Sequence, residues 1–437
     1  MACGSQSTEN GLSDEHIQIL MNCTMNEYKR IFLSLLSVWV NISSCAWAST
    51  HIGQISILKR FVVMDGACAW PVLTVLPNGD LAALIWPYPN HGHHEGAAES
   101  WVSSDHGLTW AKAGVPVMNI PGVARLNVAG GMAADGNYIA VVSGWAEKPT
   151  IANVTSYMPP KVRLNAEGVV VARSADFGHT WVAQPEQVFQ QADGKNVIPY
   201  GRVTSIAGLT LGVMCYMDDV LFYTSDDNGI SWRERGIVST GRVHNETTWL
   251  RLQNGELYAA ARRWDDGGID GLRSSDNGLT WRLEERLTLP RQHPADMIHL
   301  PDGRLLLSYS SRNEGSWGIW VRFGDAMARN WGPPILLADL GEAHDGETGL
   351  MGRDGGYPST VIARDGSLVT RFNEHVAQDR HGMGRDGGYP STVIARDGSL
   401  VTAFYSKGNA HHQRYHVGIV KWRIAKPPEK GTTRDAN

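Results

Sequence analysis

Short apolar runs separated by turn signals cover most of the chain. Runs such as residues 255–263 (GELYAAARR) and 304–309 (RLLLSY) have the length of strands, and the chain beyond position 50 shows no convincing amphipathic-helix period. Asn-Gly and Asp-Gly pairs between apolar residues are the strongest short-range hairpin signal. They occur in LPNGDL from Leu76, AADGNY from Ala133, LQNGEL from Leu252, LPDGRL from Leu300, and ARDGSL from Ala363 and again from Ala395. The pattern predicts an all-β chain built from antiparallel hairpins.

A motif of the form Ser-x-Asp-x-Gly-x-Thr/Ser-Trp recurs along the chain. Its aspartate can accept hydrogen bonds from backbone N–H groups ahead of it, and its glycine can take the positive φ that side chains resist. The tryptophan supplies apolar surface that packs the turn against a neighbouring strand. We therefore expect the motif to form a structural corner, remote from any substrate. The copies are residues 103–110, 174–181, 225–232 and 274–281.

The spacing of these corners favours one β architecture. Successive copies start roughly 50 to 70 residues apart, which suits four-stranded units. Residues 52–424 would then form a single six-bladed β-propeller of four-stranded antiparallel sheets, with about 60 residues per blade. A strand from Gln54 would pair with one from Tyr415 and remove both exposed sheet edges. The alternative is a pair of β-sandwich domains, which do not require a regular tryptophan corner.

The N-terminal region has the features of an export signal. From Met25 the chain runs through Lys29 and Arg30 and an apolar stretch to small residues around Ala48. We expect residues 25–48 to be a signal peptide, residues 1–24 an upstream extension, and residues 425–437 a polar tail. The protein would be secreted or periplasmic. Acylation at Cys45, giving an anchored lipoprotein, is the other interpretation.

Composition excludes several classes of protein. The chain has 437 residues, 42% of them hydrophobic, and a net charge of −5 without a long basic patch, so we expect no nucleic-acid partner. The apolar part of the signal is too short for a membrane span, and none is expected. After signal cleavage Cys68 and Cys215 are the remaining cysteines, and the sequence does not decide whether they pair.

The repeated corners and Asp-Gly hairpins resemble those of the sialidase (neuraminidase) superfamily, where the motif is called the Asp-box or BNR repeat. The resemblance covers roughly residues 60–424. It implies a sialidase-like six-bladed propeller. Asp-boxes also occur in lyases, other glycosidases and non-catalytic proteins, so they indicate the superfamily more than the activity.

The resemblance also implies site residues. Glu246 precedes Arg262 by sixteen positions, as in sialidases, and Arg312 matches a further family arginine. A catalytic tyrosine is expected in the segment DGGYPST, at Tyr389 or Tyr357. The glutamate would take the phenol proton, and a neutral tyrosine avoids repulsion from a substrate carboxylate. The arginines would bind that carboxylate through bidentate forks.

The tyrosine is ambiguous because twenty residues, MGRDGGYPSTVIARDGSLVT, occur at 351–370 and again at 383–402. Such identity indicates a recent tandem duplication or an artefact of assembly, and only one copy can occupy the centre. We favour Tyr389, because its copy continues into AFYSKG and the closing strand, whereas the copy of Tyr357 continues into the polar RFNEHVAQDRHG.

Two departures from the family pattern affect the site. Ala69 stands where the first family arginine is expected, and Arg125 is the candidate to replace its charge. The segment NHGHHEGAAES has no aspartate where the family has its acid, so Glu95 or His93 becomes the candidate proton donor. A metal site at these histidines would need a distant further ligand, and we expect none.

Three functions remain open at this point. The favoured one is an exported exo-glycosidase that removes a terminal acidic sugar, most readily sialic acid, with retention of configuration. The second is a propeller polysaccharide lyase or another uronic-acid-directed glycosidase using histidine and tyrosine. The third is a non-catalytic carbohydrate-binding propeller. The expected partners are sialylated or other acidic glycans, with no cofactor; linkage preference and oligomeric state do not follow from the sequence.

Overall fold

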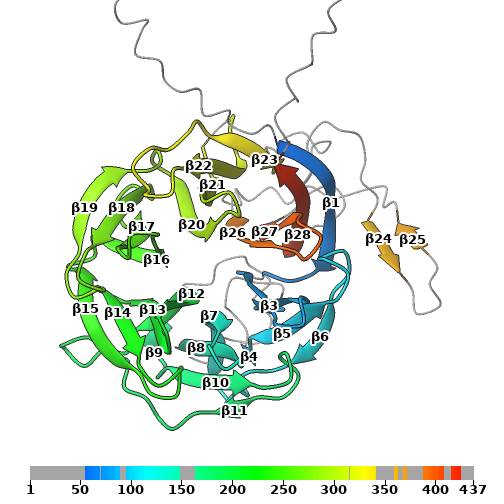
Figure 1. The fold of residues 1–437 in the computed structure, drawn as a ribbon. Coiled ribbons are helices and arrows are strands. Elements are labelled where there is room, and N and C mark those ends of the chain that lie inside the picture. The colour runs from blue at the N-terminus through cyan, green and yellow to red at the C-terminus, as the bar shows by residue number, and fades with distance from the viewer. Residues whose placement is uncertain are drawn as a thin grey trace, which may run out of the picture. The chain divides into compact units, whose positions relative to one another are not determined.

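β-strands are the regular elements of the part of the chain that the structure describes. This computed structural model describes residues 55–68, 70–88, 95–147, 163–313, 315–340, 359–362, 368–371, 387–407 and 415–424. Within these ranges no helix is long and apolar enough to cross a membrane. The expected extension, signal peptide and C-terminal tail lie outside the described residues. Gln54–Lys426 form one compact unit, in which the main sheets surround a common axis (Figure 1).

Four antiparallel sheets contain four strands each. The first has the order β2 (Val72–Val75), β3 (Leu81–Ile85), β5 (Glu99–Ser103) and β6 (Ala111–Gly114). Two others are β16 (His244–Arg251), β17 (Leu257–Arg263), β18 (Ile269–Ser274) and β19 (Arg282–Arg286), and β20 (Gln292–His299), β21 (Leu305–Ser311), β22 (Gly318–Gly324) and β23 (Ile335–Asp339). The fourth has the order β1 (Ile55–Asp65), β28 (Tyr415–Ile424), β27 (Leu400–Lys407) and β26 (Gly387–Ile394).

A larger, ten-stranded sheet lies between the first and the second of these. This sheet contains two runs of four adjacent strands. One run consists of β7 (Val123–Met132), β8 (Tyr138–Glu147), β10 (Val170–Ser174) and β11 (Val182–Ala183). The other consists of β12 (Ile198–Ala207), β13 (Thr210–Tyr216), β14 (Val220–Ser225) and β15 (Arg233–Ser239). A short parallel pairing of β7 with β12 joins the runs, and β4 (Gly96–Ala97) and β9 (Arg163–Ala166) pair with β7 and β8. Separately, β24 (Ser359–Ile362) and β25 (Leu368–Arg371) pair with each other.

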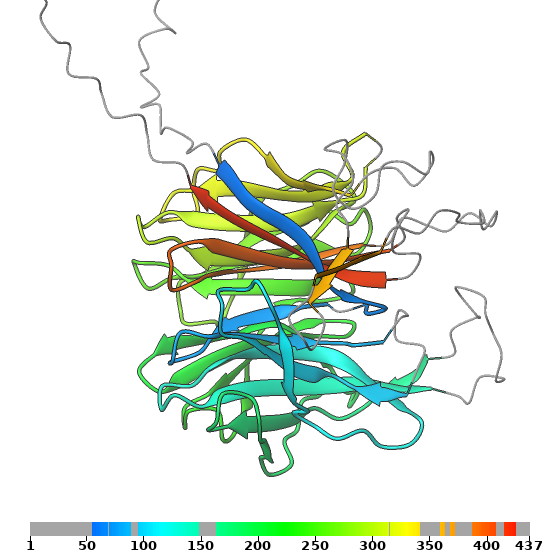
Figure 2. The same ribbon diagram turned by 90° about the vertical axis from the view of Figure 1, so that its right-hand side faces the viewer.

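The two ends of the compact unit meet in one sheet. β1 pairs antiparallel with β28 from Ile55 opposite Ile424 to Asp65 opposite His416, and the two strands lie side by side in Figure 2. This confirms the predicted pairing of the strand from Gln54 with the strand from Tyr415. The pairing covers the edge of β28 and adds the N-terminal strand to a sheet made of C-terminal residues.

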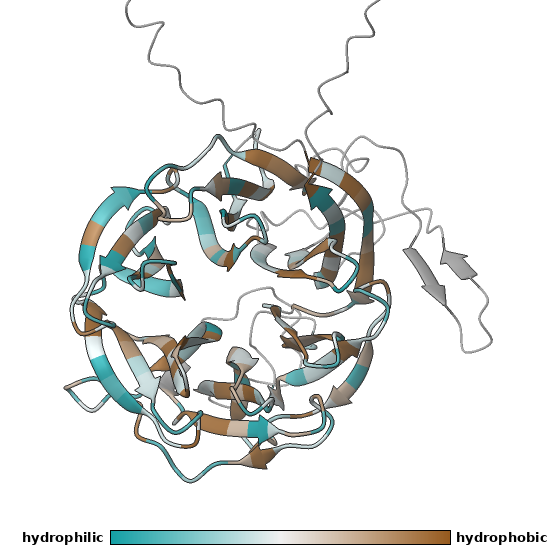
Figure 3. Ribbon diagram, viewed as in Figure 1, coloured by the Kyte–Doolittle hydropathy of each residue, from teal (hydrophilic) through white to brown (hydrophobic). Residues whose placement is uncertain are grey.

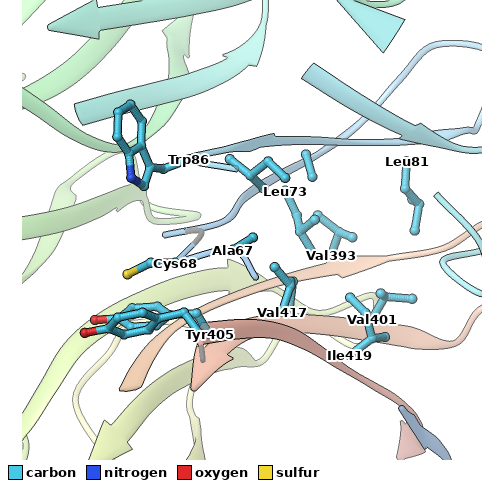
Figure 4. Close-up of a cluster of buried hydrophobic side chains, with 14 of the residues drawn as sticks. Ala67, Cys68, Leu73, Leu81, Trp86, Val393, Val401, Tyr405, Val417 and Ile419 are labelled. Atoms are coloured by element: carbon cyan, nitrogen blue, oxygen red, sulfur yellow. The ribbon is translucent and has the colours of Figure 1, made fainter. Parts of the chain in front are cut away.

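Apolar side chains fill the spaces between neighbouring sheets. In one cluster Leu73 and Leu81 of the first sheet pack against Val393, Val401 and Ile419 of the sheet that contains β1 and β28 (Figure 4). Comparable clusters join each further pair of successive four-stranded groups along the chain. Outer strands such as β15 and β19 are mainly hydrophilic, as Figure 3 shows. Burial of these faces supplies most of the favourable free energy of folding.

The two cysteines whose pairing the sequence left open are both buried, and neither is in a disulfide. Cys68 lies in the cluster of Figure 4, whereas Cys215 lies in the cluster between β7–β10 and β12–β14. They therefore do not form a disulfide in this structure.

The Asp-boxes form the corners that the sequence predicts. In the first box Asp105 Oδ1 accepts hydrogen bonds from the N–H groups of Leu108 and Thr109 at 3.0 and 2.8 Å, and Trp110 Nε1 donates to the Gly107 carbonyl at 3.1 Å. Gly107 has a φ of 86°, and the preceding His106 also has a positive φ of 61°. The four box tryptophans are not among the residues that line the central cavity, which confirms their structural role.

A fifth corner, at Asp325, has no match to the sequence motif. Asp325 Oδ1 accepts from the N–H groups of Met327 and Arg329, and its Oδ2 accepts from Asn330 Nδ2 at 2.6 Å. Ala328 takes a positive φ of 54° there in place of a glycine. One extra residue between the aspartate and Trp331 conceals this corner from the pattern.

Loss of a box aspartate should lower stability without lowering turnover. Burial raises the pKa of Asp276, but hydrogen bonds from Thr280 and Ser274 outweigh it and lower the pKa to about 2. We expect Asp276→Ala to lower the free energy of unfolding by about 1–3 kcal/mol at pH 7, because several backbone and hydroxyl donors lose their acceptor. Thermal unfolding measures the loss, and the exposed neighbour Ser275→Ala is the control.

The difference in stability between wild type and Asp276→Ala should become smaller as the pH falls. A carboxyl group whose folded pKa is depressed stabilises the fold above its unfolded pKa and loses that contribution as pH falls toward the folded value. The gap in Tm between wild type and Asp276→Ala should therefore narrow between about pH 4 and pH 2. An equal difference in Tm at pH 7 and pH 2.5 would show that the ionised Asp276 carboxylate does not stabilise the corner.

Candidate active site

The innermost strands of the sheets converge on a cavity of about 350 Å³. β2, β7, β12, β16, β20 and β26, each the first or last strand of a four-stranded group, contribute to its lining, and β8, β13 and β17 add Trp145, Tyr216 and Arg262. The cavity is therefore built by segments from every main sheet around the axis.

Glu246 is the centre of a hydrogen-bonded group in this cavity. Tyr389 Oη donates to Glu246 Oε1, and Arg262 Nη1 donates to Glu246 Oε2 at 2.6 Å. β16 and β17 form a hairpin, which explains why residues sixteen positions apart meet. Glu246 is 6% exposed, so its charge is shielded from water and paired with the arginine. The structure thus brings together three of the residues predicted from the sequence.

The tyrosine is held as a neutral phenol. Burial and the Glu246 charge raise the pKa of Tyr389 well above its usual value, and Arg262 and Arg312 offset only part of this rise. A phenol that stays protonated at neutral pH needs a base before it can act as a nucleophile. Glu246, which accepts its hydrogen bond, is placed to be that base.

Arg312 lies close enough to Tyr389 to act on it electrostatically, although it is not among the cavity-lining residues. His293, 5% exposed, is a further titratable group in this neighbourhood. Burial and the charges of Arg312, Arg262 and Arg291 lower the pKa of His293, so its imidazole is neutral. Arg262, which lines the cavity, and Arg312, which acts on Tyr389 from outside that lining, therefore place positive charge on this side of the cavity.

Trp70 lines the cavity next to the position where the family has its first arginine. Ala69 itself lies outside the described residues. Trp70 has a positive φ of 40°, and its ring lies edge-on to Tyr389 with the centroids 6.1 Å apart and to Tyr405 with the centroids 5.7 Å apart. An aromatic wall thus adjoins the tyrosine, where a third guanidinium was expected from the resemblance.

Of the remaining sequence-predicted residues, the two that the structure describes, Arg125 and Glu95, do not line the cavity. Arg125 is buried in β7, and Glu167 is the charge that acts on it. Glu95 is exposed and stands directly before β4. His93 and Tyr357 lie outside the described residues. Among the residues that the structure does describe, no group of three or more His, Cys, Asp or Glu side chains could hold a metal ion.

Sequence reasoning missed several residues of the cavity. Arg202 and Asp296 form an ion pair at its wall, Tyr200 has its ring 6.4 Å from that of Tyr389, and Trp145 adds a further aromatic surface. Arg202 and Asp296 are 94 positions apart and carry no local motif. Only the meeting of β12 with β20 at the axis makes them neighbours.

The family is shown by a sequence match. The BNR repeat-like domain matches residues 140–401, more than half of the chain, so the chain belongs to this family. It is a divergent, sialidase-like member of the BNR superfamily. No curated protein matches the chain.

Solved structures show the same fold. A protein of unknown function from Dyadobacter fermentans is 19% identical with a TM-score of 0.62, and the match covers 85% of this chain and 99% of that one. The NanB sialidase from Streptococcus pneumoniae is 12% identical with a TM-score of 0.53, over 84% of this chain and 70% of that one. The intramolecular trans-sialidase from Ruminococcus gnavus is 14% identical with a TM-score of 0.53, over 84% and 98%.

Proposed function

We propose that the protein is a sialidase-like exo-glycosidase that removes a terminal acidic sugar, most readily sialic acid, with retention of configuration. One observation carries the proposal: in the central cavity the Tyr389 hydroxyl donates to the buried carboxylate of Glu246. Arg262 on the same carboxylate and Arg312 near the tyrosine supply cations for an acidic substrate. The sialidases among the structural neighbours are consistent with this chemistry.

The reaction would proceed in two displacements. Tyr389 Oη attacks the anomeric carbon while Glu246 accepts the phenol proton, and the bond from the anomeric carbon to the leaving oxygen breaks. The leaving oxygen takes a proton from a general acid. Water then attacks the anomeric carbon and gives a proton to the deprotonated general acid, while the Tyr389 oxygen leaves and takes back the proton held by Glu246. Two inversions give net retention.

We assign the general acid to the segment that holds His93 and Glu95. Glu95 directly precedes β4, which pairs with β7, and β7 contributes Leu126 and Val128 to the cavity wall. A donor at Glu95 would approach the leaving group from the side of β7. Substrates with good leaving groups need little protonation and bypass it.

We further propose that residues 52–424 are one six-bladed β-propeller and that residues 25–48 direct export. The ten-stranded sheet separates into two four-stranded antiparallel runs, and apolar clusters join successive groups, including the last group with the first. Both features support a closed ring of four-stranded blades. The basic start, apolar core and small-residue end of 25–48 support secretion or a periplasmic location, with Cys45 as an alternative anchor.

Assay of purified protein on a fluorogenic sialoside, beside a panel of uronic-acid glycosides, tests the proposal. We expect release of the fluorophore from the sialoside, and NMR of the first-formed sugar should show the anomeric configuration of the substrate. A product that absorbs in the ultraviolet would instead indicate elimination by a lyase. Saturable binding of the sugar without turnover would indicate a carbohydrate-binding propeller, and either result would overturn the proposal.

A further inference from the structure

Arg202 and Asp296 form a bidentate ion pair at the wall of the central cavity. Arg202 Nε donates to Asp296 Oδ1 at 2.8 Å and Nη2 donates to Oδ2 at 2.7 Å. The side chains are 14% and 7% exposed, so each charge depends on the other for compensation. Arg202 also lines a second cavity, of about 320 Å³, with Val203 and Thr392. Arg202 therefore borders both cavities, whereas Asp296 borders the central one.

The ion pair binds Ser391 and Thr392, which follow Tyr389 after Pro390. Arg202 Nη2 donates to the Thr392 carbonyl at 2.6 Å and to Ser391 Oγ at 3.3 Å, and the Thr392 N–H donates to Asp296 Oδ2 at 2.8 Å. Ser391 Oγ also accepts from the N–H of Leu73 at 3.0 Å, and Arg202 Nη1 donates to the Leu73 carbonyl at 3.0 Å. One pair thus joins β12, β20, β26 and β2.

Tyr389 needs such support because its own strand does not hold it. Its φ is +50°, which is unfavourable for an aromatic residue, and Gly388 before it has a φ of +126°. The pairing of β26 with β27 is irregular between Gly388 and Ser391, so Tyr389 lies in a bulge between the two. A strained conformation of this kind persists only where surrounding contacts impose it.

We infer that the Arg202–Asp296 ion pair is a positioning device that holds Tyr389 against Glu246 by fixing Ser391 and Thr392 across the axis. The pair does not touch the reacting atoms; it acts through the backbone of β26. Its kinetic consequence rests on the proposed function, whereas its structural consequence does not. The same contacts also join β26 to β2 and β20.

Arg202→Lys tests the inference, because lysine keeps the charge but loses the planar fork. We expect kcat on a fluorogenic sialoside to fall about tenfold or more while KM changes less than about threefold, since a small displacement of a nucleophile lowers turnover steeply. Arg273→Lys is the matched control. Arg273 is also a buried fork, bound to Glu284 at 2.7 Å and Glu256 at 2.9 Å, but it lies in β18 and does not line the cavity.

The control separates positioning from plain stability. Both variants should lower Tm, but Arg273→Lys should leave kcat per folded molecule unchanged. In a Tyr389→Phe background Arg202→Lys should cause no further loss of the residual turnover, because residues that act through one step are not additive. An equal loss of kcat in both lysine variants, or an additive loss with Tyr389→Phe, would overturn the inference.

Crystal structures of the variants give a readout that does not need activity. The Tyr389–Glu246 hydrogen bond should open in Arg202→Lys and persist in Arg273→Lys; its persistence in both would overturn the inference. If Arg202→Lys does not fold, Ser391→Ala removes only the hydroxyl that Leu73 and Arg202 contact, and should lower kcat by about fivefold with the same shift of Tyr389. Wild-type protein without turnover would refute the proposed function, and the structures would still decide the inference.

Discussion

Phenylalanine at position 389 should remove nearly all turnover while leaving the fold intact. We expect Tyr389→Phe and Glu246→Ala each to lower kcat on a sialoside by roughly 10²–10⁴-fold, the range lost with a catalytic proton-transfer group. The reason is that the phenol, whose pKa is raised by burial and by Glu246, cannot become a nucleophile without the carboxylate that accepts its hydrogen bond. Steady-state kinetics with matched circular dichroism spectra measures the effect.

The double mutant should distinguish a shared step from two separate roles. If Glu246 activates Tyr389, Glu246→Ala/Tyr389→Phe should cost little more than either change alone. A loss of kcat in the double mutant equal to the product of the two single losses would place the two residues in different steps. Full activity of Tyr389→Phe with loss in Tyr357→Phe would move the reaction to the other copy of the duplicated segment, and full activity in both would refute a tyrosyl intermediate.

Tyr258 provides a matched control for this experiment. Its hydroxyl donates to Glu285 Oε1 at 2.9 Å, so it forms a buried tyrosine–glutamate pair of the same kind within the sheet of β17 and β19. It does not line the cavity. Tyr258→Phe should lower stability by about 0.5–1.5 kcal/mol and leave kcat unchanged.

The second large effect should fall on recognition of the substrate carboxylate. We expect Arg312→Lys to raise KM for a sialoside about 10- to 100-fold, because lysine keeps the charge but loses a charge-assisted fork. The corresponding methyl ester, which lacks the carboxylate charge, should bind wild type and variant equally. Arg262→Lys should raise KM similarly and also lower kcat, since Arg262 bonds Glu246 at 2.6 Å.

Arg322→Lys is the control for this prediction. Arg322 uses its guanidinium group on backbone carbonyls, including those of Gly332 at 2.8 Å and Trp331 at 3.1 Å, and it is not among the charges that act on Tyr389 or His293. Its replacement should leave KM unchanged. If Arg312→Lys binds acid and ester with an unchanged ratio, the carboxylate is recognised elsewhere and the assignment of Arg312 fails.

Much of the fold could be predicted because its signals are local. Each Asp-box places the aspartate, the glycine and the donors of its hydrogen bonds within eight residues, so the corner follows from the sequence alone. The corner at Asp325 went unrecognised because an extra residue and Ala328 at positive φ replace the familiar spacing. The grouping of sheets around the axis rested on the spacing of these corners.

The site was predictable only where a hairpin or the family pattern links its residues. Glu246 and Arg262 face each other across the hairpin of β16 and β17. Their spacing in the sequence is therefore enough to predict their contact. Trp70 beside Tyr389, and Arg202 on Asp296, are contacts between sheets far apart in sequence. Hydrophobic periodicity and residue spacing within one segment of the sequence do not predict which inner strands meet at the axis.

The duplicated segment separates local from tertiary causes most clearly. Its two copies form the same hairpin in the same register: Val361 pairs with Val369 in β24 and β25, and Val393 pairs with Val401 in β26 and β27. Twenty identical residues therefore dictate the hairpin, because turn chemistry and alternation act within it. They cannot dictate its place. In the second copy β27 continues to Lys407 and pairs along its length with β28, and Arg202, Asp296 and Glu246 contact the segment around Tyr389. Burial against neighbouring sheets and hydrogen bonds to β12, β16 and β20 hold that copy in place, and both arise only when these sheets come together in the tertiary structure.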